Sequence, residues 1–218
     1  MAKIRVLLVD DHDLIRYGLR RLLEDKGLEV VDEANSGELA MEKVRKLKPD
    51  VVLMDVNMPG IGGYEATSRI SVTHPECKVI ILTAHSDGPL PRRLLEAGAA
   101  GYLTKGCPVE TMIEAIRKVN SGQRYIEANI AQKLALSMLP GEGSVLDTLS
   151  QRELQVLMMI SRGIRTNQIS EMLSLSPKTV STYRARLHEK LDVSNDVEMM
   201  HLAIKHGLLE GIDSESGK

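Results

Sequence analysis

The sequence predicts an α/β domain with a doubly wound, five-stranded parallel sheet, joined by a linker to a second domain that is entirely helical. In the first half, short continuous apolar runs such as Val51–Met54 alternate with helical patterns, as expected for strands buried on both faces. After Ser150 only helical patterns with legible N-caps remain. With 218 residues, 43% of them hydrophobic, the chain can form two cores of ordinary size.

Five apolar runs are expected to form the strands of the first domain. They are Ile4–Val9, Leu28–Val31, Val51–Met54, Val79–Leu82 and Gly101–Leu103. Helical spacing predicts helices between and after them, over residues 12–25, 36–47, 62–71, 91–97 and 109–119. This alternation is typical of a parallel sheet with helices on both faces. We expect the domain to span residues 1–122.

Residues 123–148 are expected to form a linker, with a helix over 126–139 and a flexible hinge at Pro140–Ser144. The second domain is predicted to span residues 149–210. Its four helices are expected at 150–161, 166–173, 176–191 and 195–208. Ser150 with Glu153 forms a capping box, and Ser176 precedes Pro177, which favours the first turn of a helix. Residues 211–218 are expected to be a flexible tail.

Composition excludes several classes of protein. The net charge is −2, so a surface that binds nucleic acid would need positive charge concentrated in one part of the chain. The sequence has no run of 18 apolar residues and its N-terminus is typical of a first strand, which predicts a cytoplasmic protein without membrane association. Its two cysteines lack the spacing of a metal site or a disulfide framework. It contains no Phe or Trp, which argues against base stacking on aromatic side chains.

Charged and polar residues follow four of the expected strands, where each strand ends. They are Asp10 and Asp11, Asp55, Thr83 and Lys105. Ligands of open parallel sheets bind outside the carboxyl ends of the strands, so these side chains are expected to share one site. Three carboxylates would repel one another unless a cation neutralised them, and oxygen ligands of this kind fit Mg²⁺. A hydroxyl and an ammonium beside them would suit transfer of a phosphoryl group to Asp55 as nucleophile.

Taken singly, these residues have simpler interpretations. Asp55 would cap the loop that Pro59-Gly60 forces, Thr83 would be a strand-end hydroxyl, and Lys105 would be a solvated loop lysine. Five such residues at successive strand ends favour one shared site.

Residues 3–122 resemble a two-component receiver domain, which has a flavodoxin-like fold. The matching features are the pair Asp10-Asp11, Asp55 followed by Met58-Pro59-Gly60, Thr83-Ala84, and Lys105. The resemblance implies that Asp55 is the phospho-acceptor and a sensor histidine kinase the phosphodonor. It implies further that Mg²⁺ is held by Asp11, Asp55 and the backbone carbonyl of Asn57, with Asp10 acting through water.

The same resemblance assigns Tyr102 as the aromatic switch residue, which turns inward as Thr83 moves toward the phosphate. Its simpler interpretation is a half-buried tyrosine on an edge strand. Two positions depart from the family pattern. Gly106 follows Lys105 where many receivers have proline, and His85 occupies a position that tunes the lifetime of the phosphate.

The expected third helix of the second domain presents small polar residues on one face. Lys178, Ser181, Thr182 and Ala185 share this face, with Arg184 and Arg186 beside it. Between residues 162 and 190 there are six Lys or Arg and two Glu, a net charge of +4 that could also belong to a solvated helix. Ser and Thr bond base edges, Ala meets a thymine methyl and Arg holds phosphates, so the pattern favours double-stranded DNA as the partner.

The stretch from Leu149 to Leu191 resembles a LuxR-type DNA-binding domain, which makes the chain similar to NarL/FixJ-class response regulators. The segment from Pro177 to Arg184, which includes Thr179, is most similar to global regulators of the GacA/UvrY type. The family forms homodimers on DNA through its last helix, which here implies Val197 and Met200. Packing within the domain would explain the same apolar residues.

The resulting interpretation is a transcription regulator whose sequence-specific DNA binding is controlled by phosphorylation of Asp55, with no indication of an enzyme for an external substrate. Two alternatives remain open. A Mg²⁺-dependent phosphohydrolase would need a second carboxylate soon after the nucleophile, where Val56, Asn57 and Met58 stand. A constitutive DNA-binding regulator would not use its acidic site.

Overall fold

The computed structural model describes residues 3–84, 88–137 and 144–209. The chain forms two compact units, the first ending at Ser137 and the second following it, with the short segment up to Leu90 grouped with the second. Several sequence predictions concern residues outside the described ranges: His85, nearly all of the hinge at 140–144, and the tail. No described helix is long and apolar enough to cross a membrane.

The first unit is built on a parallel sheet, whose strand order is β2-β1-β3-β4-β5-β6 among the described residues. The strands are β1 Arg5–Val9, β2 Glu29–Ala34, β3 Val51–Met54, β4 Lys78–Thr83, β5 Gly101–Thr104 and β6 Tyr125–Ile126. The central strands β3 and β4 are almost wholly buried, which is why their sequences read as continuous apolar runs. The doubly wound sheet predicted from the sequence is confirmed.

The sixth strand corrects the prediction of five. Tyr125–Ile126 pairs in parallel with Gly101–Tyr102 of β5, beyond the Gly122 position where the domain was expected to close. Two residues are too few to produce a recognisable strand pattern in the sequence.

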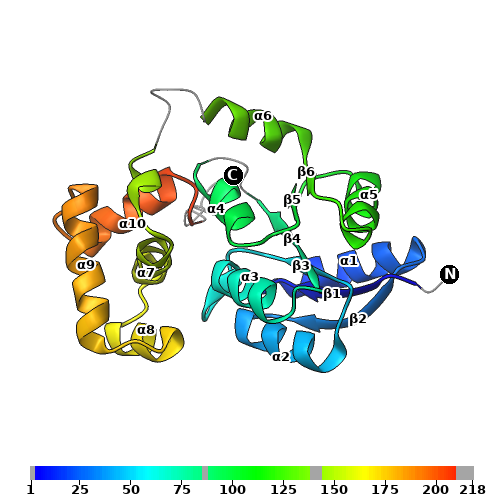
Figure 1. Cartoon of the computed structure of the whole chain (residues 1–218), viewed down its shortest axis with the longest axis horizontal. Helices are drawn as coiled ribbons and strands as arrows, with labels where there is room; N and C mark the ends of the chain where they lie inside the picture. The colour runs from blue at the N-terminus through cyan, green and yellow to red at the C-terminus, as the bar shows by residue number, and fades with distance from the viewer. Residues whose placement is uncertain (1–2, 85–87, 138–143, 210–218) are drawn as a thin grey trace, which may run out of the picture. The chain divides into compact units, whose positions relative to one another are not determined.

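Helices cover both faces of this sheet (Figure 1). They are α1 Asp13–Asp25, α2 Gly37–Leu47, α3 Gly62–Thr73, α4 Leu90–Glu96 and α5 Val109–Asn120. On one face, Leu23 of α1 and Ile116 of α5 pack with alternate strand residues such as Leu8 and Leu53. On the other face, α2 and α3 contribute buried side chains such as Val44 and Ile70. After β6, α6 covers Ala128–Ser137, within the range where a linker helix was expected.

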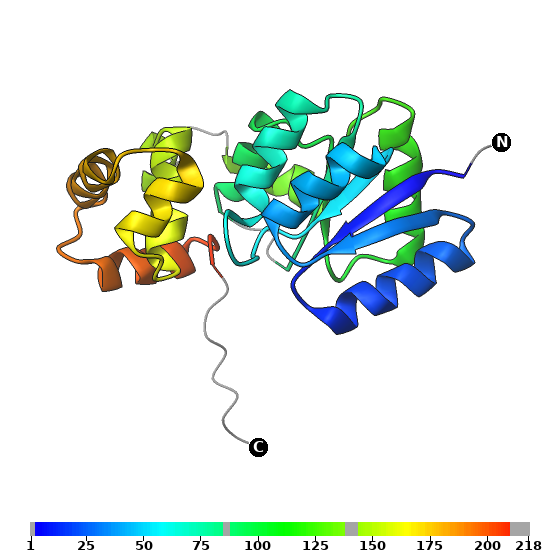
Figure 2. The same cartoon turned by 90° about the horizontal axis from the view of Figure 1, so that it is seen from below.

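The second unit consists of helices in its described part, as predicted (Figure 2). A short 3₁₀ turn at Val145–Thr148 precedes α7 Gln151–Ser161, α8 Thr166–Leu173, α9 Pro177–Leu191 and α10 Asp196–Lys205. The caps explain these boundaries. Ser150 and Glu153 form the capping box of α7, while Ser176 and Asn195 accept hydrogen bonds from the first turns of α9 and α10.

Candidate functional site

The carboxyl ends of four neighbouring strands bring the predicted side chains together in the first unit. Asp10 follows β1, Asp55 follows β3, Thr83 ends β4 and Lys105 follows β5. The ammonium of Lys105 lies 2.9 Å from Oδ2 of Asp10 and 3.2 Å from Oδ2 of Asp55. Its backbone N–H donates to the carbonyl of Thr83 at 2.7 Å. A cation, two carboxylates and a hydroxyl-bearing strand end therefore share one site.

Burial sets the electrostatics of this site. Asp55 is 1% exposed and Asp10 3% exposed. Burial raises the pKa of Asp55 to about 6, with Lys105 opposing the rise and Asp10 adding to it. Burial alone would lower the pKa of Lys105, but Asp55 and Asp10 outweigh it and hold that pKa above its ordinary value. A poorly solvated carboxylate is a suitable nucleophile. The fixed ammonium beside it can stabilise the negative charge of the group that the carboxylate attacks.

The carboxylates fit a hard cation. Carboxylate oxygens of Asp10, Asp11 and Asp55 and a ring nitrogen of His12 all lie within 4.8 Å of one another. Among the described residues, Oδ2 of Asp10, Oδ1 of Asp11 and Oδ2 of Asp55 are buried atoms that receive no hydrogen bond of good geometry. Ion pairing with Lys105 or His12 offsets only part of their charge. Oxygen ligands with unused lone pairs are what Mg²⁺ binds, so the residues present fit this ion.

His12 belongs to this cluster but was missed from the sequence. Its Nδ1 lies 3.1 Å from Oδ1 of Asp10 and 3.0 Å from Oδ1 of Asp11. The hydrogen bond with Asp10, followed by the charge of Asp11, raises the pKa of His12. Its position directly after the acidic pair was the available signal.

The loop after Asp55 is held by two helices. The N–H of Gly63, in α3, donates to the carbonyl of Val56 at 3.1 Å. Oε1 of Glu38, in α2, accepts from the N–H of Ile61 at 3.0 Å. The carboxylate of Asp55 itself accepts from the N–H of Val56 at 2.8 Å. These bonds fix the backbone that carries the nucleophile.

The switch candidates Thr83 and Tyr102 are both 1% exposed, on the adjacent strands β4 and β5. Tyr102 is therefore fully buried on an interior strand, because β6 covers β5, and the interpretation as a half-buried edge residue is wrong. Burial raises the pKa of its phenol. The backbone N–H of Asn57 helps to lower the pKa of Asp55, which puts Asn57 beside the carboxylate. Its carbonyl as a metal ligand stays a prediction.

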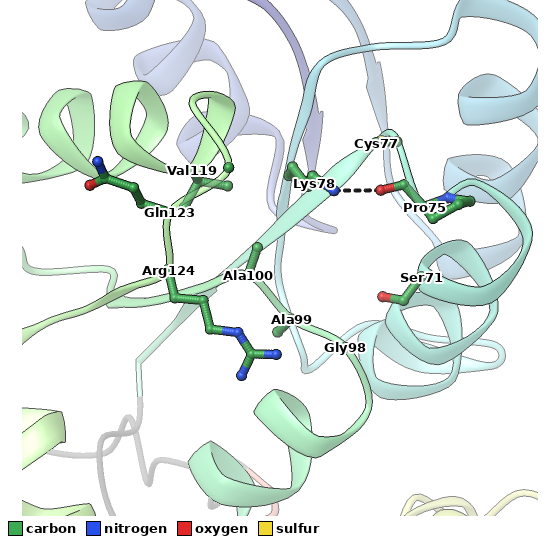
Figure 3. A pocket seen from close by; sticks show the side chains of 11 residues that line it. Ser71, Pro75, Cys77, Lys78, Gly98, Ala99, Ala100, Val119, Gln123 and Arg124 are labelled. Atoms are coloured by element: carbon green, nitrogen blue, oxygen red, sulfur yellow. Dashed lines mark hydrogen bonds between the residues drawn. The ribbon is translucent and has the colours of Figure 1, made fainter.

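A separate pocket lies at the opposite, amino ends of β4 and β5 (Figure 3). Its volume is about 260 Å³, and Ser71, Cys77, Lys78 and Arg124 contribute to its lining. Lys78 donates to the carbonyl of Pro75 at 2.5 Å, and burial raises the pKa of Cys77 to about 12. A protonated thiol and an ammonium engaged with the backbone offer no nucleophile here. The reactive groups gather at the other end of the sheet.

In the second unit, α9 exposes the face predicted to contact DNA. Val180, Leu187 and Leu191 are buried, as expected, and the outer face is formed by Lys178, Ser181, Thr182, Ala185 and Arg186, which are all exposed. Thr179 lies at the border of this face and its hydroxyl is 2.7 Å from that of Ser176. The hydroxyls of Ser181 and Thr182 donate to helix carbonyls, which leaves their oxygens available as acceptors.

Arg184 and Lys190, two of the basic residues of α9, have acidic partners. Arg184 forms a two-pronged ion pair with Asp196 of α10, with its Nε 2.9 Å from Oδ1. Lys190 donates to the buried carboxylate of Glu153 at 2.8 Å. The positive charge available on α9 is smaller than the sequence count suggests. Arg184, which lies beside the predicted DNA face, is ion-paired with Asp196.

The predicted dimer residues lie on α10. Val197 is 57% exposed and Met200 is partly exposed, whereas Met199 between them is buried in the unit. An exposed valine beside a half-exposed methionine is compatible with either a small interface or an ordinary surface.

Comparison with known proteins agrees with this division into two units. Residues 6–117 match the model of the response regulator receiver domain, and residues 147–203 match that of the bacterial regulatory proteins of the luxR family.

Similar proteins cover almost the whole chain. The response regulator UvrY of Escherichia coli K12 is 54% identical over 94% of this chain and 95% of its own length. The response regulator GacA of Pseudomonas viridiflava is 53% identical, over 95% of this chain and 98% of its own length. RcsB of Salmonella enterica serovar Typhimurium, solved bound to the rprA promoter in the presence of BeF₃⁻, has a TM-score of 0.73 at 24% identity, covering 92% of this chain and 98% of its own. That likeness supports the fold.

Proposed function

The chain belongs to the response regulators that join a receiver domain to a LuxR-type DNA-binding domain, and on this premise we propose that Asp55 is the phospho-acceptor that controls DNA binding. The observation that carries the proposal is the placement of the Lys105 ammonium against the buried carboxylates of Asp10 and Asp55.

The residues divide the chemistry between them. An oxygen of Asp55 attacks the phosphorus of a kinase phosphohistidine, so that a P–O bond forms and the P–N bond breaks. The electron pair of the broken bond stays on the imidazole, which takes a proton from solvent. Lys105 offsets the charge on the phosphoryl oxygens, and the hydroxyl of Thr83 would donate to one of them. Burial of Asp55 keeps water from competing for the site.

Mg²⁺ is the cofactor that these residues would hold. Asp11 and Asp55 are proposed as direct ligands with the carbonyl of Asn57, while Asp10 would act through a water molecule. When bound, the ion neutralises charge that develops on the phosphoryl oxygens. The buried oxygens of these carboxylates have lone pairs that accept no hydrogen bond, so a cation would stabilise them regardless of which phosphodonor is used.

For the output, α9 is proposed to enter the major groove of double-stranded DNA. Lys178 and Arg186 would contact phosphates, while Ser181, Thr182 and Ala185 would approach base edges, with Thr179 and Arg184 at the border of the contact. RcsB, which has the same fold, is bound to a promoter in its solved complex. We propose that this protein binds DNA as a homodimer through Val197 and Met200 in the cytoplasm, and that phosphorylation shifts it toward the binding-competent state.

Treatment with acetyl phosphate and Mg²⁺, followed by intact-mass measurement, tests the first half of the proposal. We expect wild type to gain one phosphoryl group and Asp55→Asn to gain none. Asp13→Asn is the matched control, because Asp13 lies close to the acidic pair but its side chain is 92% exposed. Modification of Asp55→Asn to the same extent as wild type would contradict the assignment.

Two further assays address the alternatives. Release of phosphate from small phosphomonoesters would favour a phosphohydrolase. DNA binding that is unchanged by phosphorylation and by Asp55→Asn would favour a constitutive regulator.

A further inference from the structure

Glu127 connects the strand that carries the switch residues to the helix that leaves the first unit. It follows β6 directly, and α6 begins at the next residue. In Figure 1, α6 continues from β6 at the edge of the sheet beside β5. The carboxylate of Glu127 therefore has access to the end of β5 from a segment outside the receiver motif.

The carboxylate, the backbone N–H and the carbonyl of Glu127 each form a hydrogen bond in this connection. Oε2 accepts two hydrogen bonds from Thr104, one from the backbone N–H at 2.8 Å and one from the hydroxyl at 2.9 Å. The backbone N–H of Glu127 donates to the carbonyl of Tyr102 at 3.1 Å. Its own carbonyl accepts from the N–H of Ala131 at 2.9 Å, which starts α6. One residue thus bonds two positions of β5 and the first turn of α6.

The residues that Glu127 holds adjoin the phosphorylation site. Thr104 precedes Lys105, whose ammonium pairs with Asp10 and Asp55 and whose N–H bonds Thr83. A movement of the end of β5 would therefore change the position of Lys105 and the geometry around Glu127 together. Ile130 in α6 is fully buried and α6 belongs to the first unit, so we expect this helix to follow such a movement.

We propose that Glu127 is a positioning residue of the phosphorylation switch, which couples the end of β5 to the start of α6. The inference rests on the proposed function. Charging Asp55 with a phosphoryl group changes what Lys105 pairs with, and Glu127 passes the resulting shift of β5 to α6 and so toward the output domain. The two hydrogen bonds from Thr104 to one carboxylate oxygen are charge-assisted, and together they restrain the end of β5 relative to the start of α6 more than a single bond would.

The test separates phosphorylation from its readout in the full-length protein. For each variant, phosphorylation of Asp55 is measured by intact mass after acetyl phosphate and Mg²⁺. The gain in DNA affinity on phosphorylation is measured as the ratio of the affinities with and without the phosphodonor. The DNA is a duplex selected from a random library with phosphorylated wild type. Hydrogen exchange of residues 128–137 is followed in the same samples.

In Glu127→Ala we expect the gain to fall by about fivefold or more, the scale of an allosteric coupling. The phosphoryl yield should change by less than about twofold, because Glu127 touches no reacting atom. The phosphorylation-dependent change in exchange of α6 should disappear. Glu127→Gln keeps an acceptor oxygen for Thr104 and is expected to restore most of the gain.

Two other variants serve as a second test and as a control. Thr104→Val removes only the hydrogen bond from the hydroxyl and should lose part of the gain in DNA affinity. This variant tests the coupling role if Glu127→Ala does not fold. Glu42→Ala is the matched control, since Glu42 is an exposed acid on α2 whose carboxylate pairs only with Lys46 in the described chain; its gain should equal that of wild type.

The outcomes distinguish the two claims. A wild-type protein that is not phosphorylated, or that shows no gain, contradicts the proposed function itself. A normal wild-type gain that persists in both Glu127→Ala and Thr104→Val contradicts the coupling role alone. A loss in Glu127→Gln equal to that in Glu127→Ala would also overturn the proposed role of the acceptor oxygen.

Discussion

Gly63 provides a sharp test of how the phospho-acceptor is positioned, because α3 packs directly against the backbone of Asp55. A Cβ atom built on Gly63 would lie 1.9 Å from the carbonyl oxygen of Asp55 and 2.9 Å from Cα of Val56. Both neighbours are backbone, so no side chain can rotate away. To reach an ordinary contact of 3.4 Å, α3 and the end of β3 must separate by about 1.5 Å.

In Gly63→Ala we therefore expect a folded but displaced site. Overpacking of this kind costs about 1–3 kcal/mol, which a domain of this size can survive. A displacement of reacting groups by about 1 Å costs on the order of 100-fold in rate. Asp55 would move relative to Lys105, which is attached to a different strand.

The assay is the time course of phosphorylation by acetyl phosphate, with far-UV circular dichroism to establish folding. Gly106→Ala is the control near the site and Gly18→Ala the control in α1, because a Cβ at either position meets nothing within 4 Å. Both should be phosphorylated at the wild-type rate. A wild-type rate in folded Gly63→Ala would refute the claim that this close approach positions Asp55.

Three further predictions concern the second unit. Burial alone would raise the pKa of Glu153, but Lys190 and Ser150 hold it below its ordinary value of 4.5. This carboxylate therefore stabilises the fold above pH 4.5, and its contribution is lost as the pH falls through its lowered pKa. In Glu153→Gln, hydrogen exchange of residues 151–161 should lose this part of its acid sensitivity. An acid profile equal to that of wild type would contradict the assignment. Lys178→Ala should weaken binding to all duplexes about equally and reduce the salt slope by about 1, whereas a loss confined to one sequence would contradict a phosphate contact. Val197→Glu should reduce binding to paired half-sites while leaving a single half-site unaffected, and equal losses on both would contradict a dimer contact.

The layered fold was accessible from the sequence because it follows from local patterns. Strands buried on both faces produce continuous apolar runs, and α7, α9 and α10 begin at caps that the sequence displays. The two-residue strand β6 was not accessible, because it owes its existence to pairing with Gly101–Tyr102 and not to any pattern of its own.

The candidate site shows the same division. The convergence of Asp55 and Lys105 follows from the parallel sheet that the alternation of strands and helices predicts, because the carboxyl ends of its strands lie at the same edge. The engagement of Arg184 by Asp196 does not, because it depends on how α9 packs against α10. The bonds from Thr104 to Glu127 span 23 residues and likewise depend on tertiary contact.

The central claim is that a phosphoryl group on Asp55 is converted into DNA affinity, and fluorescence anisotropy with a selected duplex measures this directly. Titrations of wild type and Asp55→Asn are compared with and without acetyl phosphate and Mg²⁺. We expect the phosphodonor to tighten DNA binding of wild type by about tenfold or more and to leave that of Asp55→Asn unchanged. Equal tightening in Asp55→Asn, or none in wild type that mass measurement shows to be phosphorylated, would contradict it.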